Sequence, residues 1–144
     1  MLNNNETNKY GFSVWLQFAE EDLLSAEALL EKKIHNQVCF HSQQSVEKIL
    51  KAFLKSQKIL PPKIHSLLEL LEMCKEKNNK FCTLQKGCAY LSRFYLSVRY
   101  PDALAGVLPE GLPSFEEAKR SLAFAEEIIA FVKKILLSQR NSSV

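Results

Sequence analysis

The stretch HSQQSVEKILKAFL, residues 41–54, decides the fold. Its apolar residues recur every three or four positions, so they line one face of a helix. Together with a cysteine just upstream, these residues are Cys39, Val46, Ile49, Leu50 and Phe53. The helix is predicted to begin near Asn36, a favourable cap residue, and to end near Lys58, ahead of two consecutive prolines. The segment therefore predicts a long amphipathic helix.

The face nearly opposite the apolar one carries a polar and basic stripe. At 100° per residue the stripe consists of His41, Gln44, Lys48, Lys51, Lys55 and Lys58. Two interpretations fit this pattern: a solvated outer face of the bundle, or a cationic track for phosphate groups. Glu47 and few other acidic residues interrupt it.

Four more segments have helical period. The first covers about residues 12–33, with its apolar face at Trp15, Phe18, Ala19, Leu23, Ala26, Leu29 and Leu30. Another begins after Ser66, which forms a capping box with Glu69, and extends to about Lys77. The next covers about residues 81–99. The last opens with a second capping box, Ser114 with Glu117, and keeps a heptad of apolar positions: Ala118, Leu122, Ala125, Ile129, Val132 and Leu136.

These segments predict an all-α fold, an up-and-down antiparallel bundle of about five helices. Residues 1–144 are expected to form one domain, with a core over about 12–137 and polar termini at 1–11 and 138–144, the latter frayed. The apolar positions on the first and last helices exceed what one small bundle can hide. We therefore expect a symmetric homodimer.

Composition excludes several classes of protein. The net charge of +3 and pI of about 8.6 do not by themselves indicate nucleic-acid binding. No apolar run of about 20 residues and no signal-peptide pattern occur, which predicts a cytoplasmic protein without membrane association. The cysteines, Cys39, Cys74, Cys82 and Cys88, lack zinc-site spacing and a Cys-x-x-Cys pair. We expect free, mostly buried thiols, no metal and no cofactor.

The stretch YLSVRYPDAL, residues 95–104, contains the first candidate site. Arg99 lies in the last turn of a predicted helix, where a cation interacts favourably with the helix dipole. Tyr100 precedes Pro101 and is pushed out of helical geometry, and Asp102 is close enough in sequence to pair with Arg99. Spacing alone is consistent with a helix stop. Arg99 shares a side with Tyr95, however, so both also qualify as binding residues.

Gln43 and Glu47 form the second candidate site. They are four residues apart and flank the apolar face of their helix. Polar groups at a core boundary need partners, so either a bond to a neighbouring helix or a ligand contact fits them. No glycine-rich phosphate loop or His-Glu-x-x-His motif occurs, and no catalytic residue is assigned. His65 precedes a helix start, where its ring can cap the helix or bind a ligand.

Two stretches together, HSQQSVEKILKAFL at 41–54 and RYPD at 99–102, resemble the HEPN family, the nucleotide-binding domain of higher eukaryotes and prokaryotes. The resemblance covers about residues 12–137. It implies a helical bundle that usually dimerises and is often encoded beside a minimal nucleotidyltransferase. Some relatives are toxins that cut RNA with an arginine followed, after four to six residues, by a histidine. Here the corresponding positions after Arg99 hold Leu104, Ala105 and Gly106.

The expected function is therefore a non-enzymatic HEPN-type domain that binds a nucleotide or a nucleotidyltransferase partner, as part of a toxin–antitoxin type pair. A metal-independent ribonuclease toxin is disfavoured because the histidine that would move protons is missing. A structural interaction module is the other alternative. The possible partners are a second copy of the chain, a nucleotidyltransferase, and a nucleotide or RNA. By this resemblance Arg99 would contact the anion and Tyr95 and Tyr100 would shape a cleft. The full ligand- or partner-binding set is Arg99, Tyr100, Asp102, Tyr95, Gln43, Glu47 and Lys48.

Overall fold

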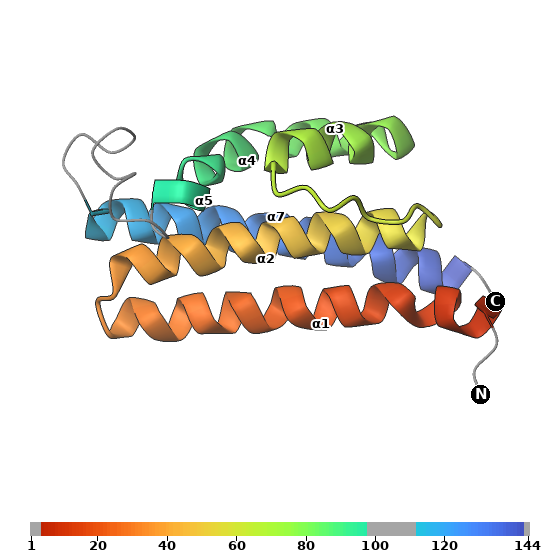
Figure 1. Cartoon of the computed structure of the whole chain (residues 1–144), viewed down its shortest axis with the longest axis horizontal. Coiled ribbons are helices and arrows are strands. Elements are labelled where there is room, and N and C mark those ends of the chain that lie inside the picture. The colour runs from red at the N-terminus through yellow and green to blue at the C-terminus, as the bar shows by residue number, and fades with distance from the viewer. Residues whose placement is uncertain (1–3, 98–111, 143–144) are drawn as a thin grey trace.

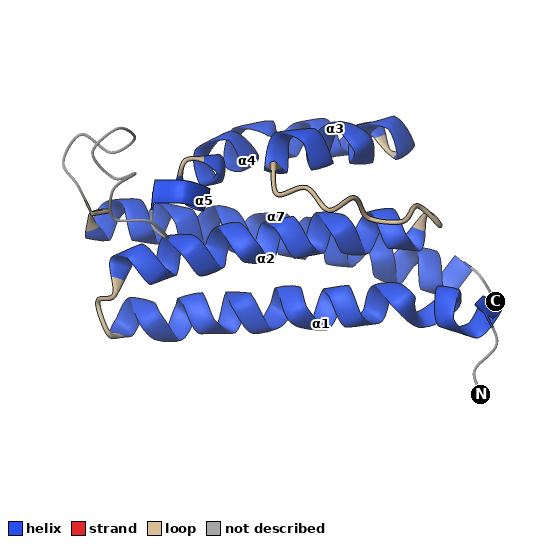
Figure 2. Ribbon diagram, viewed as in Figure 1, coloured by secondary structure: helices blue, strands red, loops and turns tan. Residues whose placement is uncertain are grey.

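Every regular element that the structure describes is a helix (Figures 1 and 2). The computed structural model describes residues 4–97 and 112–142, with side chains described over 11–95 and 112–139. In chain order the elements are α1 (Asn4–Glu31), α2 (His35–Ser56), α3 (Leu67–Lys77), the 3₁₀ helix η1 (Asn79–Leu84), α4 (Gln85–Ser92), α5 (Phe94–Ser97) and α7 (Phe115–Ser142). The prediction of an all-α bundle is confirmed.

Helix α2 is the central element of the bundle. It packs against α1 and α7 along its length and also contacts α3, α4 and α5 (Figure 1). The predicted apolar face of α2 is fully buried. After α2 the chain runs back along it as an extended linker, residues 57–66, before α3 begins (Figure 2). This linker places the start of α3 near the middle of α2 rather than at its end.

Both predicted capping boxes are confirmed, the second in its complete form. The backbone N–H of Glu117 donates to Ser114 Oγ at 3.1 Å, and the Ser114 N–H donates back to Glu117 Oε1 at 3.1 Å. The Glu69 N–H donates to Ser66 Oγ at 3.2 Å. These contacts satisfy backbone donors that a helix start otherwise leaves unpaired.

Helices α1 and α2 end in the same way, with a lysine in the left-handed region. Lys33 has φ 59° and Lys58 has φ 63°. In both cases the next residue is an isoleucine whose N–H donates to a carbonyl five residues back: Ile34 to Leu29 at 3.2 Å, and Ile59 to Leu54 at 3.0 Å. This is a Schellman arrangement, which reverses the chain within a few residues. Only residues 32–34 separate α1 from α2.

The core is continuous from α2 to α7. The rings of Phe53 and Phe81 lie 4.4 Å apart, and Phe81 meets Phe131 edge-on at 5.5 Å. Gly87 brings α4 close to α7, because a Cβ there would approach atoms of Phe124 and Ile128 to 3.0 Å. The heptad predicted on the last helix is buried at every position: Ala118, Leu122, Ala125, Ile129, Val132 and Leu136.

The predicted helix over 81–99 was wrong as one continuous element. It begins as the 3₁₀ turn η1 and is interrupted at Arg93, between α4 and α5. Next to this interruption, Ser92 Oγ donates to the Cys88 carbonyl at 2.7 Å. A serine that bonds back to the preceding turn in this way often bends a helix. The remainder of the predicted segment, from Val98, lies outside the described residues.

The predicted helix bounds were too narrow at the two ends of the chain. Helix α1 begins at Asn4 instead of near residue 12, and α7 extends to Ser142, well into the segment 138–144 that was predicted to be frayed. Residues 4–10 and 138–142 contain polar helix formers and no proline, so polar composition did not stop either helix.

Phe18, assigned to the buried face of α1, is 47% exposed. Over the described residues, no helix combines the length and apolarity that a bilayer crossing requires.

Candidate functional site

The basic stripe of α2 is neither a solvated outer face nor a continuous cationic track. The Lys51 side chain is 6% exposed, Lys48 is 25% exposed and His41 is 26% exposed. Helix α1 lies along this side of α2, and its rings cover the lysines: the Lys51 ammonium lies 5.6 Å from the Trp15 ring centre and the Lys48 ammonium 5.9 Å from that of Phe18. Both interpretations of the stripe were therefore wrong, because the helix that carries it is surrounded by other helices.

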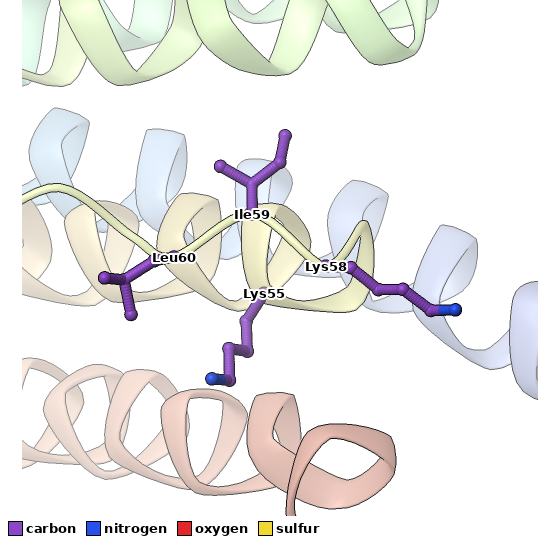
Figure 3. Close-up of a pocket in the computed structure, with 4 residues that line it drawn as sticks. All are labelled: Lys55, Lys58, Ile59 and Leu60. Atoms are coloured by element: carbon purple, nitrogen blue, oxygen red, sulfur yellow. The ribbon is translucent and has the colours of Figure 1, made fainter. Parts of the chain in front are cut away.

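The end of the stripe supports the same conclusion. Lys55 and Lys58 line a small hollow at the C-terminal end of α2, together with Ile59 and Leu60 (Figure 3). Lys55 points towards α1, whereas Lys58 points away from the linker (Figure 3). Their ammonium groups diverge, so they do not converge on one anion. Gly11 on α1 accommodates Lys55, since a Cβ there would lie 2.6 Å from Lys55 Cε.

Glu47 lies at the centre of a buried ionic cluster. Its side chain is 5% exposed, and Lys51 donates to its Oε2 at 3.2 Å from the next turn of α2. Lys51 contacts Trp15 of α1 and Glu47 contacts His65 of the linker, so the pair lies along α2 between these two segments. Removing a carboxylate and an ammonium from water is costly unless each has a partner, and here each neutralises the other.

His65 connects this buried pair to the surface and to α5. Its Nδ1 lies 3.2 Å from Oε1 and 3.3 Å from Oε2 of Glu47. Its ring stacks on Tyr95 with centres 5.0 Å apart and planes 17° from parallel. The His65 side chain is 53% exposed. One half of the cluster is therefore sealed and held in place by α2, while the other half presents an aromatic ring to solvent.

Gln43 lies one helical turn before Glu47 and is completely buried. Its Oε1 accepts a hydrogen bond from Gln44 Nε2 at 2.7 Å. Its own Nε2 has no partner among the residues that the structure describes. A buried donor without an acceptor is uncommon and costs free energy, so this amide is a candidate for a group supplied by a ligand or another chain.

A second ionic cluster lies on the α1 side of α2. Asp22 Oδ1 is 2.8 Å from His41 Nδ1, and Asp22 Oδ2 accepts from Lys48 Nζ. Burial pushes the pKa of Asp22 up, but the hydrogen bonds from His41 and Lys48 outweigh burial and leave this pKa below its ordinary value. A hollow beside the cluster is lined by Phe18, Glu21, Asp22, Ser25 and Lys48. The cluster ties α1 to α2 and keeps both helices in register.

The structure brings together three of the residues predicted for the site. Glu47 and Tyr95 meet through His65, and Gln43 adjoins Glu47 on α2. Lys48 points to the other side of α2 and pairs with Asp22. Arg99, Tyr100 and Asp102 lie outside the described residues. Their assignment stays a prediction.

Sequence reasoning missed the links between these residues. The position of His65 predicts a ring that caps the helix or binds a ligand; Ser66 caps α3, so the capping role is wrong, and His65 contacts Glu47. Lys51 was placed on an outer face and Asp22 was not singled out. No short-range spacing could have found the Glu47–His65 contact, because 18 residues separate the pair. In the described part of the chain, no three histidine, cysteine, aspartate or glutamate side chains gather as they would around a metal ion.

Comparison with known proteins identifies the family. Residues 12–135 match the model of the HEPN domain. The chain belongs to the HEPN family. This HEPN domain is 27% identical over 131 residues to "Putative toxin MJ1304" of Methanocaldococcus jannaschii, a match that covers 85% of this chain and 86% of that protein.

Two solved structures have the same fold as this HEPN domain. TT1696 from Thermus thermophilus is 29% identical with a TM-score of 0.73, covering 85% of this chain and 96% of that one. ST0689, described as an archaeal HEPN homologue, is 27% identical with a TM-score of 0.68, covering 85% of this chain and 95% of the other. The all-helical architecture is thus shared across nearly the full length of both.

Two of the three histidines of this HEPN domain contact carboxylates. His41 lies against Asp22 and His65 against Glu47, whereas His35 packs its ring 5.7 Å from that of Phe115. None of them follows an arginine at the spacing of the family's RNA-cutting members. The cluster around Glu47 combines aromatic and polar groups: His65, Tyr95 and Lys51 all adjoin the carboxylate or the ring stack that it holds.

Proposed function

We propose that this HEPN domain is a non-enzymatic binding domain, one member of a toxin–antitoxin type pair. Its ligand is a nucleotide, and its protein partner is a minimal nucleotidyltransferase. The single observation that carries the proposal is the Glu47–His65–Tyr95 cluster, in which a buried carboxylate holds a half-exposed aromatic stack in place.

The chemistry of the cluster supports a nucleotide. The exposed ring of His65, backed by Tyr95, is a platform on which a base can stack, as bases do on aromatic side chains in nucleic-acid-binding proteins. Arg99 follows Tyr95 by four residues in the sequence, and a guanidinium is suited to a phosphate group. The Nε2 of Gln43, which has no acceptor among the described residues, adds a donor one turn from Glu47.

The toxin–antitoxin type pair and the homodimer are supported by two different observations. A relative named "Putative toxin MJ1304" supports membership of a toxin–antitoxin type pair, which would act in the cytoplasm. The apolar side chains that α1 leaves exposed, Val14, Phe18 and Leu24, support a homodimer. A second copy of the chain would cover them.

Calorimetric titration with ATP and with GTP tests the nucleotide. The wild-type protein should bind at least one of them, and Arg99→Ala should weaken that binding about ten- to a hundredfold, the effect of losing a hydrogen bond to a charged group. His65→Ala should weaken it by removing the stacking surface, whereas His65→Phe should retain most of the affinity. Lys134→Ala removes a charge from an exposed position on α7 and serves as the control.

Thermal melting of the same variants separates binding from stability. We expect Arg99→Ala to melt close to the wild type. Unchanged affinity together with a large drop in melting temperature would make Arg99 a helix-end residue and refute its role in the site. If neither ATP nor GTP binds the wild-type protein, the proposal that its ligand is a nucleotide is refuted.

A further inference from the structure

A second surface of the molecule, formed by α4 and the start of α7, combines basic and aromatic residues. Three of its residues follow one side of α4 and its end at spacings of four and three: Lys86, Tyr90 and Arg93. The other three come from the first two turns of α7: Phe115, Lys119 and Arg120. Helices α4 and α7 pack directly on each other. We refer to these six residues as the α4–α7 basic face.

The cations of this face lie over its rings. The guanidinium carbon of Arg93 is 5.2 Å from the centre of the Tyr90 ring, and that of Arg120 is 5.7 Å from the same ring. On α7, the Lys119 ammonium lies 5.4 Å from the Phe115 ring centre. Stacking on the Tyr90 ring restrains the Arg120 side chain and leaves the N–H groups at the edge of its guanidinium able to bind a planar anion.

Counted over the described residues, the α4–α7 basic face has more positive than negative charge. Arg93 pairs with Glu117 at 3.2 Å, and 41% of the Arg93 side chain and 30% of the Glu117 side chain are exposed. Lys86, Lys119 and Arg120 are exposed and have no carboxylate at ion-pair distance among the described residues. Glu116 is the other acidic residue at the start of α7. An anionic partner would therefore meet cations that the protein does not itself neutralise.

Apolar groups accompany these charges. Phe115 is 45% exposed, and Leu112, three residues upstream, is 64% exposed. Protein interfaces are enriched in arginine and in aromatic residues, with apolar anchors surrounded by polar contacts. The composition of the α4–α7 basic face matches that description.

We propose that the α4–α7 basic face is a docking surface for an acidic segment of a partner protein. A single-stranded nucleic acid would also meet cations here, but it binds largely by stacking its bases on open ring faces. The Tyr90 ring already has two guanidinium groups near it and also contacts Phe94 and Phe124. Carboxylates need only the edges of the guanidinium groups, so they fit this surface better than bases do. The proposal does not depend on the nucleotide site.

Fluorescence anisotropy with two labelled probes of equal length tests the proposal. One probe is a peptide of repeated Glu-Leu-Glu-Glu and the other is oligouridylate. Wild-type protein should bind the peptide more tightly than the oligouridylate. Lys119→Ala and Arg120→Ala should each weaken peptide binding about two- to fivefold, the usual range for an exposed ion pair, and the double variant should weaken it about five- to twentyfold.

A charge-matched double variant provides the control. Lys77→Ala with Lys134→Ala removes two exposed positive charges from other parts of the surface and should leave peptide binding within twofold of the wild type. If the two double variants lose peptide affinity equally, the peptide responds only to the net charge of the protein, and the proposal is overturned. So would a peptide that does not bind the wild-type protein. Tighter binding of oligouridylate that is lost in the Lys119→Ala/Arg120→Ala variant would make the face a nucleic-acid surface instead.

Discussion

Replacement of Glu47 by leucine should be one of the most destabilising single changes in this protein. Leucine keeps most of the side-chain volume, so the change mainly leaves the ammonium of Lys51, whose side chain is only 6% exposed, without its carboxylate. Breaking a buried ion pair by removing one partner typically costs about 3–5 kcal/mol. The Trp15 ring, 5.6 Å from the ammonium, still offers a cation–π contact. We therefore expect the lower end, about 3 kcal/mol, or a fall in melting temperature of roughly 6–12 °C.

Removing both charges should reverse most of that loss. In the double variant Glu47→Leu/Lys51→Met no charge stays buried and the aliphatic stems still fill the interior, so its unfolding free energy should lie within about 1 kcal/mol of the wild type. Urea denaturation of the three proteins measures both values. If the single variant loses less than about 1 kcal/mol, the pair is solvated and the reasoning fails. The stable double variant also shows directly whether Glu47 is needed for nucleotide binding or only for packing.

Four further predictions follow from charges, burial and exposed surface. Purified protein should not cut RNA above the background of an Arg99→Ala control; cleavage that disappears in that control would reveal a ribonuclease without the usual histidine. Sedimentation should give a dimer of 16.5 kDa chains, and a single-chain mass at tens of micromolar would contradict it. At pH 8, Ellman's reagent should label the exposed Cys82 rapidly and the other three thiols slowly. Burial raises the pKa of Cys39 to about 11 and the pKa values of Cys74 and Cys88 to about 12, so little reactive thiolate is present at these positions. A Cys82→Ser variant that still reacts rapidly would argue against this. Since the pKa of folded Asp22 lies below its ordinary value of 3.8, its contribution to stability is present above that pH and is lost as the pH falls below it. The unfolding free energy of Asp22→Asn should accordingly fall less steeply than that of the wild type as the pH drops below 3.8. Identical curves would show that Asp22 is not the group that titrates there.

The fold was largely predictable because its signals are local. Capping boxes at Ser66 and Ser114 and the heptad on the last helix depend on residues a few positions apart, and all were confirmed. The interruption at Arg93 was not predicted, since a serine that bonds back to the preceding turn has the same sequence appearance as one that faces solvent.

The candidate site was less predictable because it depends on what covers α2. A helical projection places Lys51 opposite the apolar face, and in a two-layer packing that position would face water. Here α1 occupies it and supplies Trp15 and Asp22 as partners of the α2 lysines. The contacts of His65 depend on the course of the linker, which returns along α2 instead of continuing past its end. Neither feature leaves a periodic signal in the sequence.

The three-residue connection between α1 and α2 also has a consequence for the order of folding. Contacts across such a short loop join residues that are close in the chain, so little chain entropy is lost in forming them. Helix α7, in contrast, must return to α2 after a long intervening stretch of sequence. We expect the α1–α2 hairpin to form early and α7 to dock late, so substitutions at the Asp22–Lys48 contact should slow refolding, whereas those in the α7 heptad should mainly accelerate unfolding.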